Sequence, residues 1–268
     1  MNIEPKLSVI MGVHNTEDKV ILDKAILSIL NQTYSDFEFI ICDDGSTDAT
    51  CQYIKEYEKK DKRIVVISNP VNVGLAKTLN NCIDIARGQY IARMDADDIS
   101  KINRFEEQIG FLECHSEYAF VGCCAELINE NGIWGKRTHP EQPGVKAFLW
   151  GSPFIHPSIV FRKEVLVQMG GYRVSKETRR LEDLDLFMRL YKAGYRGYNL
   201  PSTFFQFRED DRSYARKKYR YRIDEAKIRF RFYREMKMLR VGIFFAMKPL
   251  VVGLIPVRLI KLLRQENV

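Results

Sequence analysis

The sequence lacks several features that would each place a chain in a particular class of protein. It contains six cysteines, and no cysteine or histidine pair follows Cys123-Cys124 at the spacing of a zinc site. In a chain of this size this argues against a disulfide scaffold and a structural zinc site, so the cysteines are expected to be reduced and buried. The absence of a GxxxxGK[ST] phosphate loop, a GxGxxG motif and an internal repeat argues against P-loop, dinucleotide-binding and repeat proteins.

Long hydrophobic runs are also scarce. Residues 1–6 lack a basic segment followed by an apolar core, and the apolar run at 7–13 is too short for a signal peptide, so we expect no secretion. The apolar stretch at 241–260 is interrupted by Lys248 and Pro249. Because a spanning helix needs about 20 apolar residues without a central charge, this stretch favours helices that lie on a membrane surface over a transmembrane helix.

The composition of the chain is that of a folded globular protein. Hydrophobic residues make up 46% and charged residues 29%, which leaves no argument for disorder. A chain of 268 residues accommodates one α/β core of about 200 to 250 residues and an appendage. The formal net charge of +7 arises after Phe205, because the preceding residues are close to balanced. The charge therefore indicates an anionic partner for the appendage.

Strand-like and helix-like patterns alternate through the first hundred residues. A β-branched apolar run at 7–13 is followed by Asn15 and a segment whose apolar residues have helical spacing. This alternation predicts a parallel sheet joined by right-handed crossovers. It continues with a strand at 37–42, a helix through Tyr53 and Tyr57, a strand at 64–68, a helix from Leu75 closed by Gly88, and a strand at 90–94.

The second half of the sequence has a different rhythm. The reversal at Asn131-Gly132 predicts a hairpin after a strand at 119–128, so the sheet should be mixed. We therefore predict an α/β fold with a single Rossmann-like domain, a mixed but mainly parallel central sheet and a C-terminal helical tail. The remaining predicted elements are a helix to about Cys114, a strand at 159–162 and a helix from Glu182 to Ala193 that stops at Gly194.

Polar side chains follow each predicted parallel strand, where such sheets bind ligands. Two carboxylates about 4 Å apart repel by about 4 kcal/mol at an effective dielectric constant of about 20, so a fold keeps a carboxylate cluster only if cations compensate it. Oxygen ligands of this kind suit Mg²⁺ or Mn²⁺, with substrate phosphates completing the coordination. The polar groups are Asn15, Asp43-Asp44-Gly45-Ser46, Asn72-Val73-Gly74 and Asp95-Ala96-Asp97-Asp98.

Simpler roles remain open for these acidic residues. Asp97 and Asp98 could cap the next helix, and Asp44 could belong to a turn alone. Glu182 and Asp183 open a predicted helix, where carboxylates are favoured by the helix dipole without any catalytic task. The chemical alternative is that Asp183 acts as a general base that takes a proton from an attacking hydroxyl group.

In this order, the motifs resemble those of the inverting glycosyltransferases of family 2, which have the GT-A fold and include bacterial polysaccharide, lipopolysaccharide and capsule enzymes. The resemblance covers about residues 6–207. Each motif is weak alone, but the ordered set is specific. The motifs lie at 8–11 with Asn15, and at 30–34, 42–48, 72–76, 90–98, 156–158 and 182–185.

The resemblance implies a role for each motif. Asp44, together with Asp43, would bind the nucleotide base. Asp95 and Asp97 would form the DxD site for Mn²⁺ or Mg²⁺ and the donor diphosphate, and Asp183 would be the general base. For Arg104, a surface or core-bracing role is favoured. Further contacts to the nucleotide sugar would come from Asn15, Asn72, Gly74 and Arg93. The candidates for contacts to the acceptor or the diphosphate are His156, Glu182 and Arg208.

Three departures from the family pattern leave the carboxylates intact. Gly12-Val13-His14 replaces the more usual Pro-x-Tyr, and Lys101-Ile102 stands where Leu-Pro is common. The segment 207–212 contains arginine but no histidine, so the diphosphate contact of Arg208 is an open expectation.

The expected activity is transfer of a hexosyl or N-acetylhexosaminyl group from a nucleotide-diphosphate sugar, with UDP-sugar favoured, to a hydroxyl of a glycan acceptor. We expect a catalytic domain at 1–211, with its nucleotide-binding half at about 1–100 and its acceptor half at about 101–211. A nucleotidyltransferase would usually have a glycine-rich basic loop near the N-terminus, which is missing at 11–16. A non-catalytic membrane adaptor would have lost a carboxylate, and none is missing.

The basic and aromatic tail at 212–268 is compatible with either nucleic acid or a membrane interface. The interrupted apolar stretch that follows favours an anionic membrane surface and no nucleic acid, while packing on the catalytic domain or on a second copy remains an alternative. The tail then predicts a cytoplasmic protein at the inner face of the cell membrane with a polyprenyl-diphosphate-linked glycan acceptor. A homo-oligomer is left open.

Overall fold

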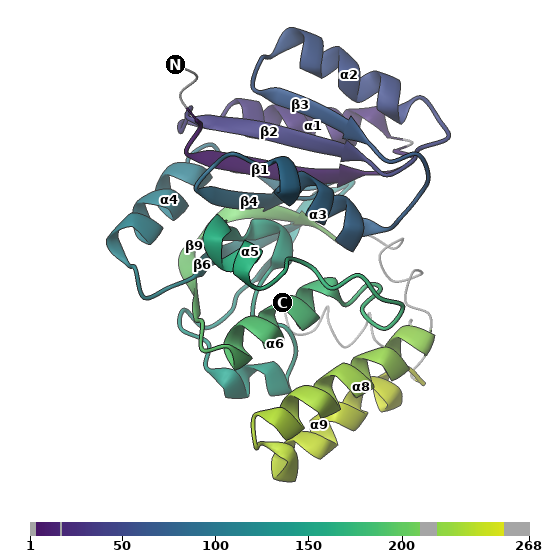
Figure 1. Cartoon of the computed structure of the whole chain (residues 1–268), viewed down its shortest axis with the longest axis vertical. Helices are drawn as coiled ribbons and strands as arrows, with labels where there is room; N and C mark the ends of the chain where they lie inside the picture. The colour runs from purple at the N-terminus through teal and green to yellow at the C-terminus, as the bar shows by residue number, and fades with distance from the viewer. Residues whose placement is uncertain (1–3, 17, 210–218, 255–268) are drawn as a thin grey trace.

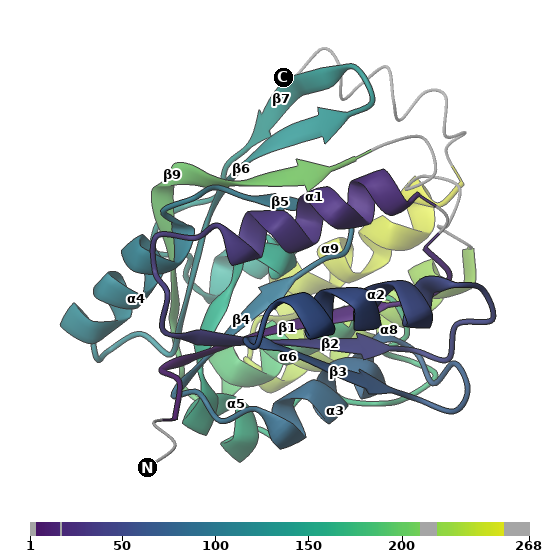
Figure 2. The same cartoon turned by 90° about the horizontal axis from the view of Figure 1, so that it is seen from above.

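The computed structural model describes residues 4–16, 18–209 and 219–254. Its centre is a mixed sheet in the order β3-β2-β1-β4-β8-β6-β9-β5, with β7 paired to β6 (Figures 1 and 2). This confirms the predicted α/β architecture. The strands are β1 (Leu7–Val13), β2 (Phe37–Asp43), β3 (Ile64–Ser68), β4 (Tyr90–Met94), β5 (Ile99–Ser100), β6 (Phe120–Asn129), β7 (Gly132–Arg137), β8 (Val160–Arg162) and β9 (Gly197–Arg208).

Helices cover both faces of the sheet, so its central strands are buried on both sides and consist of nearly continuous apolar runs. Apolar residues of α1, α2 and α4 pack in one core, and those of α3, α5 and α6 pack in the other. The helices are α1 (Lys19–Leu30), α2 (Thr50–Lys60), α3 (Leu75–Ile85), α4 (Arg104–Cys114), α5 (Lys163–Gln168), α6 (Glu182–Lys192), α8 (Tyr219–Glu235) and α9 (Leu239–Val252), with 3-10 turns η1 (Val145–Leu149) and η2 (His156–Ser158).

Strands β1 to β4 form the predicted parallel half of the sheet. In the parallel pairing of β1 with β2, Val13 lies opposite Asp43, and Met11 lies opposite Met94 of β4. The carboxyl ends of these strands therefore meet at one edge, which brings the polar motifs that follow them to the same side of the molecule.

The second half of the sheet is mixed, as predicted. Strand β8 is antiparallel to β4 and β6, whereas β9 is parallel to β6. The hairpin between β6 and β7 turns at Gly132, whose φ of +108° is a conformation that favours glycine. The strand expected from residue 159 begins at Val160, because Ser158 and Ile159 donate to Ile155 and His156 and close a 3-10 turn first.

One predicted helix end is wrong. Helix α3 ends at Ile85, followed by Ala86 in an extended conformation, and does not continue to a glycine cap at Gly88. Gly88 instead allows a close approach to the start of β1, since a Cβ atom there would lie 2.5 Å from the nitrogen of Ser8. Gly88 is therefore required by close packing and does not mark the end of the helix.

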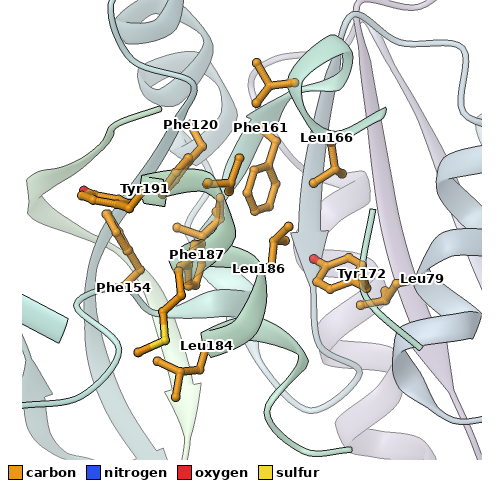
Figure 3. Packing of buried hydrophobic residues seen from close by; sticks show 14 of the residues in the cluster. Leu79, Phe120, Phe154, Phe161, Leu166, Tyr172, Leu184, Leu186, Phe187 and Tyr191 are labelled. Atoms are coloured by element: carbon orange, nitrogen blue, oxygen red, sulfur yellow. The ribbon is translucent and has the colours of Figure 1, made fainter. Parts of the chain in front are cut away.

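A cluster of aromatic side chains fixes α6 against the sheet. Figure 3 shows Phe187 of α6 among Phe120, Phe154 and Phe161, and its ring centroid lies 5.3 Å from that of Phe120 and 5.0 Å from that of Phe154. Aromatic pairs at these separations contribute about 0.5–1.5 kcal/mol beyond the burial of their surface. The packing holds the first turn of α6, which contains Glu182 and Asp183, in a defined position.

The C-terminal helices α8 and α9 form a hairpin beside α6 (Figure 1). Ile228, Phe232 and Tyr233 of α8 belong to the same core cluster as α6, and the buried Arg229 donates to the carbonyl of Phe148 at 2.8 Å. The described part of the tail therefore packs on the catalytic domain. The predicted boundary at 211/212 and the residues after 254 lie outside the described residues.

No described helix combines the length and the apolar character needed to traverse a lipid bilayer.

Candidate active site

Loops after β1 and β2 are joined at the carboxyl edge of the sheet. Asn15 has a φ of 44°, a left-handed conformation that asparagine tolerates better than most residues. Its side-chain oxygen accepts a hydrogen bond from the backbone N–H of Thr47 at 2.9 Å, and its own backbone N–H donates to Ser46 at 2.9 Å. The amide side chain of Asn15 thus shapes this edge through the neighbouring loop.

The two aspartates after β2 have different environments. Asp44 accepts hydrogen bonds from the backbone N–H groups of Val73 and Gly74, both at 2.9 Å, and from the side chain of Asn69 at 3.0 Å. Its carboxylate is therefore occupied in holding the loop that precedes α3. Asp43 accepts from Ser46 through one oxygen, while its buried Oδ1 has no hydrogen-bond partner among the described residues.

The loop held by Asp44 contains the other two residues predicted after β3. Gly74 has a φ of +89°, which favours glycine, and its N–H points to Asp44. Gly45 makes the close approach possible, because a Cβ atom there would lie 2.4 Å from the backbone of Val71. Asn72 is exposed at the same loop.

Three carboxylates gather after β4. Oxygen atoms of Asp95, Asp97 and Asp98 all lie within 4.8 Å of one another. Asp98 is 1% exposed, and its Oδ2 has no hydrogen-bond partner among the described residues. Burial, followed by the charges of Asp97 and Asp95, raises the pKa of Asp98 well above its usual range. Oxygen atoms at this spacing can share one divalent cation, so the structure places Asp98 beside the two aspartates of the predicted DxD site.

Arginine side chains brace this cluster from inside the protein. Arg93 on β4 is 2% exposed and forms an ion pair with Asp95. Although burial lowers the pKa of Arg93, the charge of Asp95 holds it above its usual value. Arg104 is fully buried and donates to the carbonyls of Arg93 and Pro157 at 3.0 and 3.2 Å, which is the core-bracing role expected for it.

Arg208 at the end of β9 also contacts the carboxylate cluster. Its backbone N–H donates to Asp98 at 2.7 Å, and its Nε donates to the carbonyl of Asp97 at 3.0 Å. The pairing of β9 with β5 explains this position, because β5 begins directly after Asp98. A residue far away in the sequence is thereby placed beside the candidate metal site.

The acidic pair at the start of α6 is less constrained. Glu182 and Asp183 are partly exposed, and neither forms an ion pair with a described residue. Burial, followed by the charge of Asp183, raises the pKa of Glu182 to about 7, and burial also raises the pKa of Asp183. Asp185, by contrast, pairs with Arg173 at 2.7 Å and Arg189 at 2.8 Å and has a structural role.

His156 lies in the same region as a neutral side chain. Its Nε2 is 2.7 Å from the hydroxyl group of Tyr172, and the residue is 7% exposed. Burial and the nearby charge of Arg93 lower its pKa well below the usual value. His156 is therefore suited to hydrogen bonding rather than to binding phosphate as a cation.

A cavity of about 470 Å³ joins the loop after β4 to the start of α6, whereas Asn15, Asp43, Asp44 and Asn72 are not among the residues that line it. Asp95 and Asp97 line it from the loop after β4, and Glu182 and Asp183 line it from the first turn of α6. The size is within the range of about 300–1,000 Å³ that is usual for small-molecule sites. The structure thus brings together the candidate metal ligands and the candidate base, which are separated by more than eighty positions in the chain.

Comparison with known proteins shows the family of the chain. The family model described as Glycosyl transferase family 2 matches residues 8–176, more than half of the chain. The chain belongs to glycosyltransferase family 2. It is 40% identical over 257 residues to EpsE of Bacillus subtilis, which carries a provisional glycosyltransferase name, with 96% of this chain and 92% of EpsE covered. It is 33% identical to the O-antigen biosynthesis glycosyltransferase WbnJ of Escherichia coli, over 80% of this chain and 83% of WbnJ.

Solved structures confirm the fold of this glycosyltransferase. TarS of S. aureus in complex with UDP-GlcNAc has a TM-score of 0.69 and 19% identity, covering 93% of this chain and 71% of the TarS chain. The mannosyltransferase PcManGT of Pyrobaculum calidifontis, in complex with GDP-Man and Mn²⁺, has a TM-score of 0.66 and 16% identity, covering 94% and 74% of the two chains.

The 470 Å³ cavity also contains residues to which the sequence pattern gave a different role. Tyr221, Arg222 and Glu225 of α8 line it, although their segment was interpreted as part of a membrane tail. Arg180 also lines the cavity and has a φ of 65°. In a basic and aromatic segment, the sequence alone does not distinguish residues that face a cavity from residues that face a membrane.

A second cavity, of about 680 Å³, lies at the opposite ends of the parallel strands. It is lined by Lys6, Arg87 and Lys163, among others, and Lys163 donates to the carbonyl of Ala86 at 2.5 Å. Although larger, it is far from the carboxyl edge of the sheet and lacks the carboxylate cluster, so its position does not support a catalytic role.

Proposed function

We propose that the enzyme transfers a sugar, with inversion, from a UDP-sugar to a hydroxyl group of a lipid-linked glycan during synthesis of a bacterial surface polysaccharide. The observation that carries the proposal is the cavity shared by Asp95, Asp97 and Asp183. Relatives named for polysaccharide synthesis support it. One of them, WfgD of Escherichia coli, 35% identical over 136 residues, is named a UDP-Glc:alpha-D-GlcNAc-diphosphoundecaprenol glucosyltransferase.

The residues present fit a divalent cation. Asp95, Asp97 and Asp98 supply closely spaced oxygen atoms, and the buried Oδ2 of Asp98, which has no partner among the described residues, is the kind of group that a cation would satisfy. When bound there, Mn²⁺ or Mg²⁺ would neutralise negative charge on the donor diphosphate. Arg93 would keep Asp95 in position through their buried ion pair.

Asp183 would act as the general base. As the acceptor hydroxyl oxygen forms its bond to the anomeric carbon, Asp183 takes the hydroxyl proton, and the bond from that carbon to the diphosphate oxygen breaks with its electron pair leaving on UDP. A single in-line displacement inverts the anomeric centre. The raised pKa of Asp183, caused by burial, makes the carboxylate a stronger base than an exposed aspartate.

Asp43 is the better candidate of its pair for contact with the nucleotide base. The carboxylate of Asp44 is already occupied by the loop at 69–74, whereas the Oδ1 of Asp43 has no partner among the described residues. An N–H group of uracil could donate to this oxygen. Asp44 would then act indirectly, by keeping the loop and Asn72 at the edge of the nucleotide site.

The decisive experiment is a screen of the purified protein against UDP-, GDP- and dTDP-sugars, with Mn²⁺ or Mg²⁺, for binding and for hydrolysis of the donor. We expect metal-dependent binding of UDP-sugars that is lost in Asp97→Asn. Asp183→Asn should retain binding and lose transfer. If no nucleotide sugar binds in the presence of either metal, the proposed function is wrong.

We also propose that α9 rests on an anionic membrane surface. Its exposed apolar residues include Val241, Phe244 and Val251, which are 57%, 77% and 62% exposed. Basic residues lie at Lys237 and Arg240 near the start of the helix and at Lys248 within it. Apolar side chains flanked by basic ones match the boundary between headgroups and acyl chains of an anionic leaflet.

Point substitutions test this contact better than truncation, because α8 contributes Phe232 and Tyr233 to the core and its removal would expose that core. Phe244→Glu combined with Val251→Glu should abolish sedimentation with phosphatidylglycerol vesicles. Ile133→Glu, a matched change at a 59% exposed position on β7, should leave it unchanged. Equal sedimentation of all three proteins would reject the membrane contact.

A further inference from the structure

The first turns of α8 form one wall of the catalytic cavity. Tyr221, Arg222 and Glu225 line the same cavity as Asp183. The helix is anchored independently of the cavity, since Arg229 donates to the carbonyl of Phe148 and Arg231 pairs with Glu177 at 2.9 Å. The position of α8 is therefore defined by the catalytic domain itself.

The side chain of Arg222 is held in place along its length. Its Nη1 lies 3.3 Å from Glu225, and Glu225 in turn receives hydrogen bonds of 2.9 and 2.7 Å from Arg229. Gly253, directly after α9, allows the close packing of its stem, because a Cβ atom at Gly253 would lie 3.0 Å from the Cγ of Arg222. Both helices of the hairpin thus position this guanidinium group.

Arg222 has capacity to bind an anion. A guanidinium group carries five N–H donors, and the contact with Glu225 uses one of them among the described residues. Its side chain is 21% exposed. Two other arginines line the cavity: Arg93 on the sheet, which is already paired with Asp95, and Arg180 on the loop before α6. A cavity rich in carboxylates therefore has a partly free cation on the wall formed by α8.

The place of Arg222 in the cavity indicates which substrate it meets. On the proposed function the donor is bound by the loops after β1 to β4, of which the loop after β4 reaches this cavity through Asp95 and Asp97, whereas Asp183 belongs to α6, on which α8 packs. A group bound against α8 is therefore on the side of the base rather than of the nucleotide loops. On the proposed function, this is the side of the acceptor, whose first sugar is joined to a lipid by a diphosphate.

We propose that α8 is the acceptor-binding wall of this glycosyltransferase and that Arg222 binds the diphosphate of the lipid-linked acceptor. The planar guanidinium group can bind two phosphate oxygens at once, a geometry that lysine cannot reproduce. Tyr221 adds an aromatic side chain to the same wall. The inference rests on the proposed function but assigns residues and a binding chemistry beyond it.

The probe for this inference is geranyl diphosphate, with geraniol as the neutral control, titrated into the full-length protein with and without saturating UDP and Mn²⁺. We expect the wild type to bind the diphosphate in preference to the alcohol. Arg222→Ala should weaken diphosphate binding about tenfold, and Arg222→Lys should restore it only in part. Arg220→Ala, on the same helix at a side chain that is 70% exposed, is the matched control and should bind normally.

The UDP affinity of each variant separates this inference from the proposed function. We expect Arg222→Ala to bind UDP as the wild type does. An equal loss of UDP and geranyl diphosphate would place Arg222 at the donor and overturn the inference, as would unchanged binding of geranyl diphosphate. Failure of the wild type to bind UDP would contradict the proposed function, while the titration without nucleotide would still test Arg222.

Discussion

The donor and acceptor sides of the proposed active site are built differently. On the donor side, polar side chains are held by hydrogen bonds to neighbouring loops. Asp44 accepts three such bonds, and Asn15 accepts one from the backbone of Thr47. On the acceptor side, Glu182 and Asp183 form no ion pair with a described residue and have raised pKa values. The difference suggests that the donor site is preorganised, whereas the acceptor side keeps reactive groups available for proton transfer.

The largest effect should separate the two acidic roles on α6. Asp183→Asn preserves the shape of the side chain but removes the base, so kcat should fall about a thousandfold with UDP affinity unchanged. Asp185→Asn should instead lower the melting temperature, because Arg173 and Arg189 lose the carboxylate charge that they share, with a smaller loss of kcat. Comparable kcat values for the two variants would contradict the assignment of the base.

The donor side should lose stability rather than reactivity when its scaffold is broken. Asp44→Ala removes three hydrogen bonds and should lower the free energy of unfolding by about 2 to 4 kcal/mol, with weaker UDP binding because the loop at 69–74 is released. Urea denaturation measures the first effect and a UDP titration the second. Asp84→Ala, at an exposed position on α3, is the control and should change neither.

A smaller effect tests the close packing of α9 on α8, the helix that lines the acceptor side. A Cβ atom at Gly242 of α9 would lie 2.7 Å from Tyr233 of α8, so Gly242→Ala should separate the helices and cost about 1 to 2 kcal/mol in unfolding free energy. Gly110→Ala on α4 meets nothing within 4 Å and should be neutral or slightly stabilising. If both variants unfold alike, the close packing of the hairpin is not what holds it.

The same comparison explains what the sequence could predict. The strands of the donor half were predicted almost to the residue, because buried parallel strands form apolar runs and their ends carry polar motifs. The division of labour between Asp43 and Asp44 was not visible, since it depends on backbone N–H groups of a distant loop. The cavity-facing residues Arg222 and Glu225 were missed because only tertiary packing turns one side of α8 towards Asp183.

The last prediction concerns pH on the acceptor side. Burial and the charge of Asp183 raise the pKa of Glu182 to about 7. Below that pH Glu182 is mostly protonated and uncharged, so Glu182→Gln should remove the inflection near pH 7 from the kcat/KM profile and leave the acidic limb set by Asp183 in place. Glu164→Gln, at an exposed residue on α5, should retain the inflection.

The raised pKa of Glu182 should also make the free energy of unfolding depend on pH. A carboxyl group whose pKa is raised by folding favours the folded state when protonated, and this advantage is lost as the pH rises through about 7. Glu182→Gln should therefore unfold like the wild type below the ordinary glutamate pKa and be more stable above pH 7. Allowing for the partial exposure of the side chain, the gain should be about 1 kcal/mol. If the difference in unfolding free energy between Glu182→Gln and the wild type is the same below the ordinary glutamate pKa and above pH 7, Glu182 titrates normally. The acceptor side would then not differ from the donor side in the pKa of its carboxyl groups.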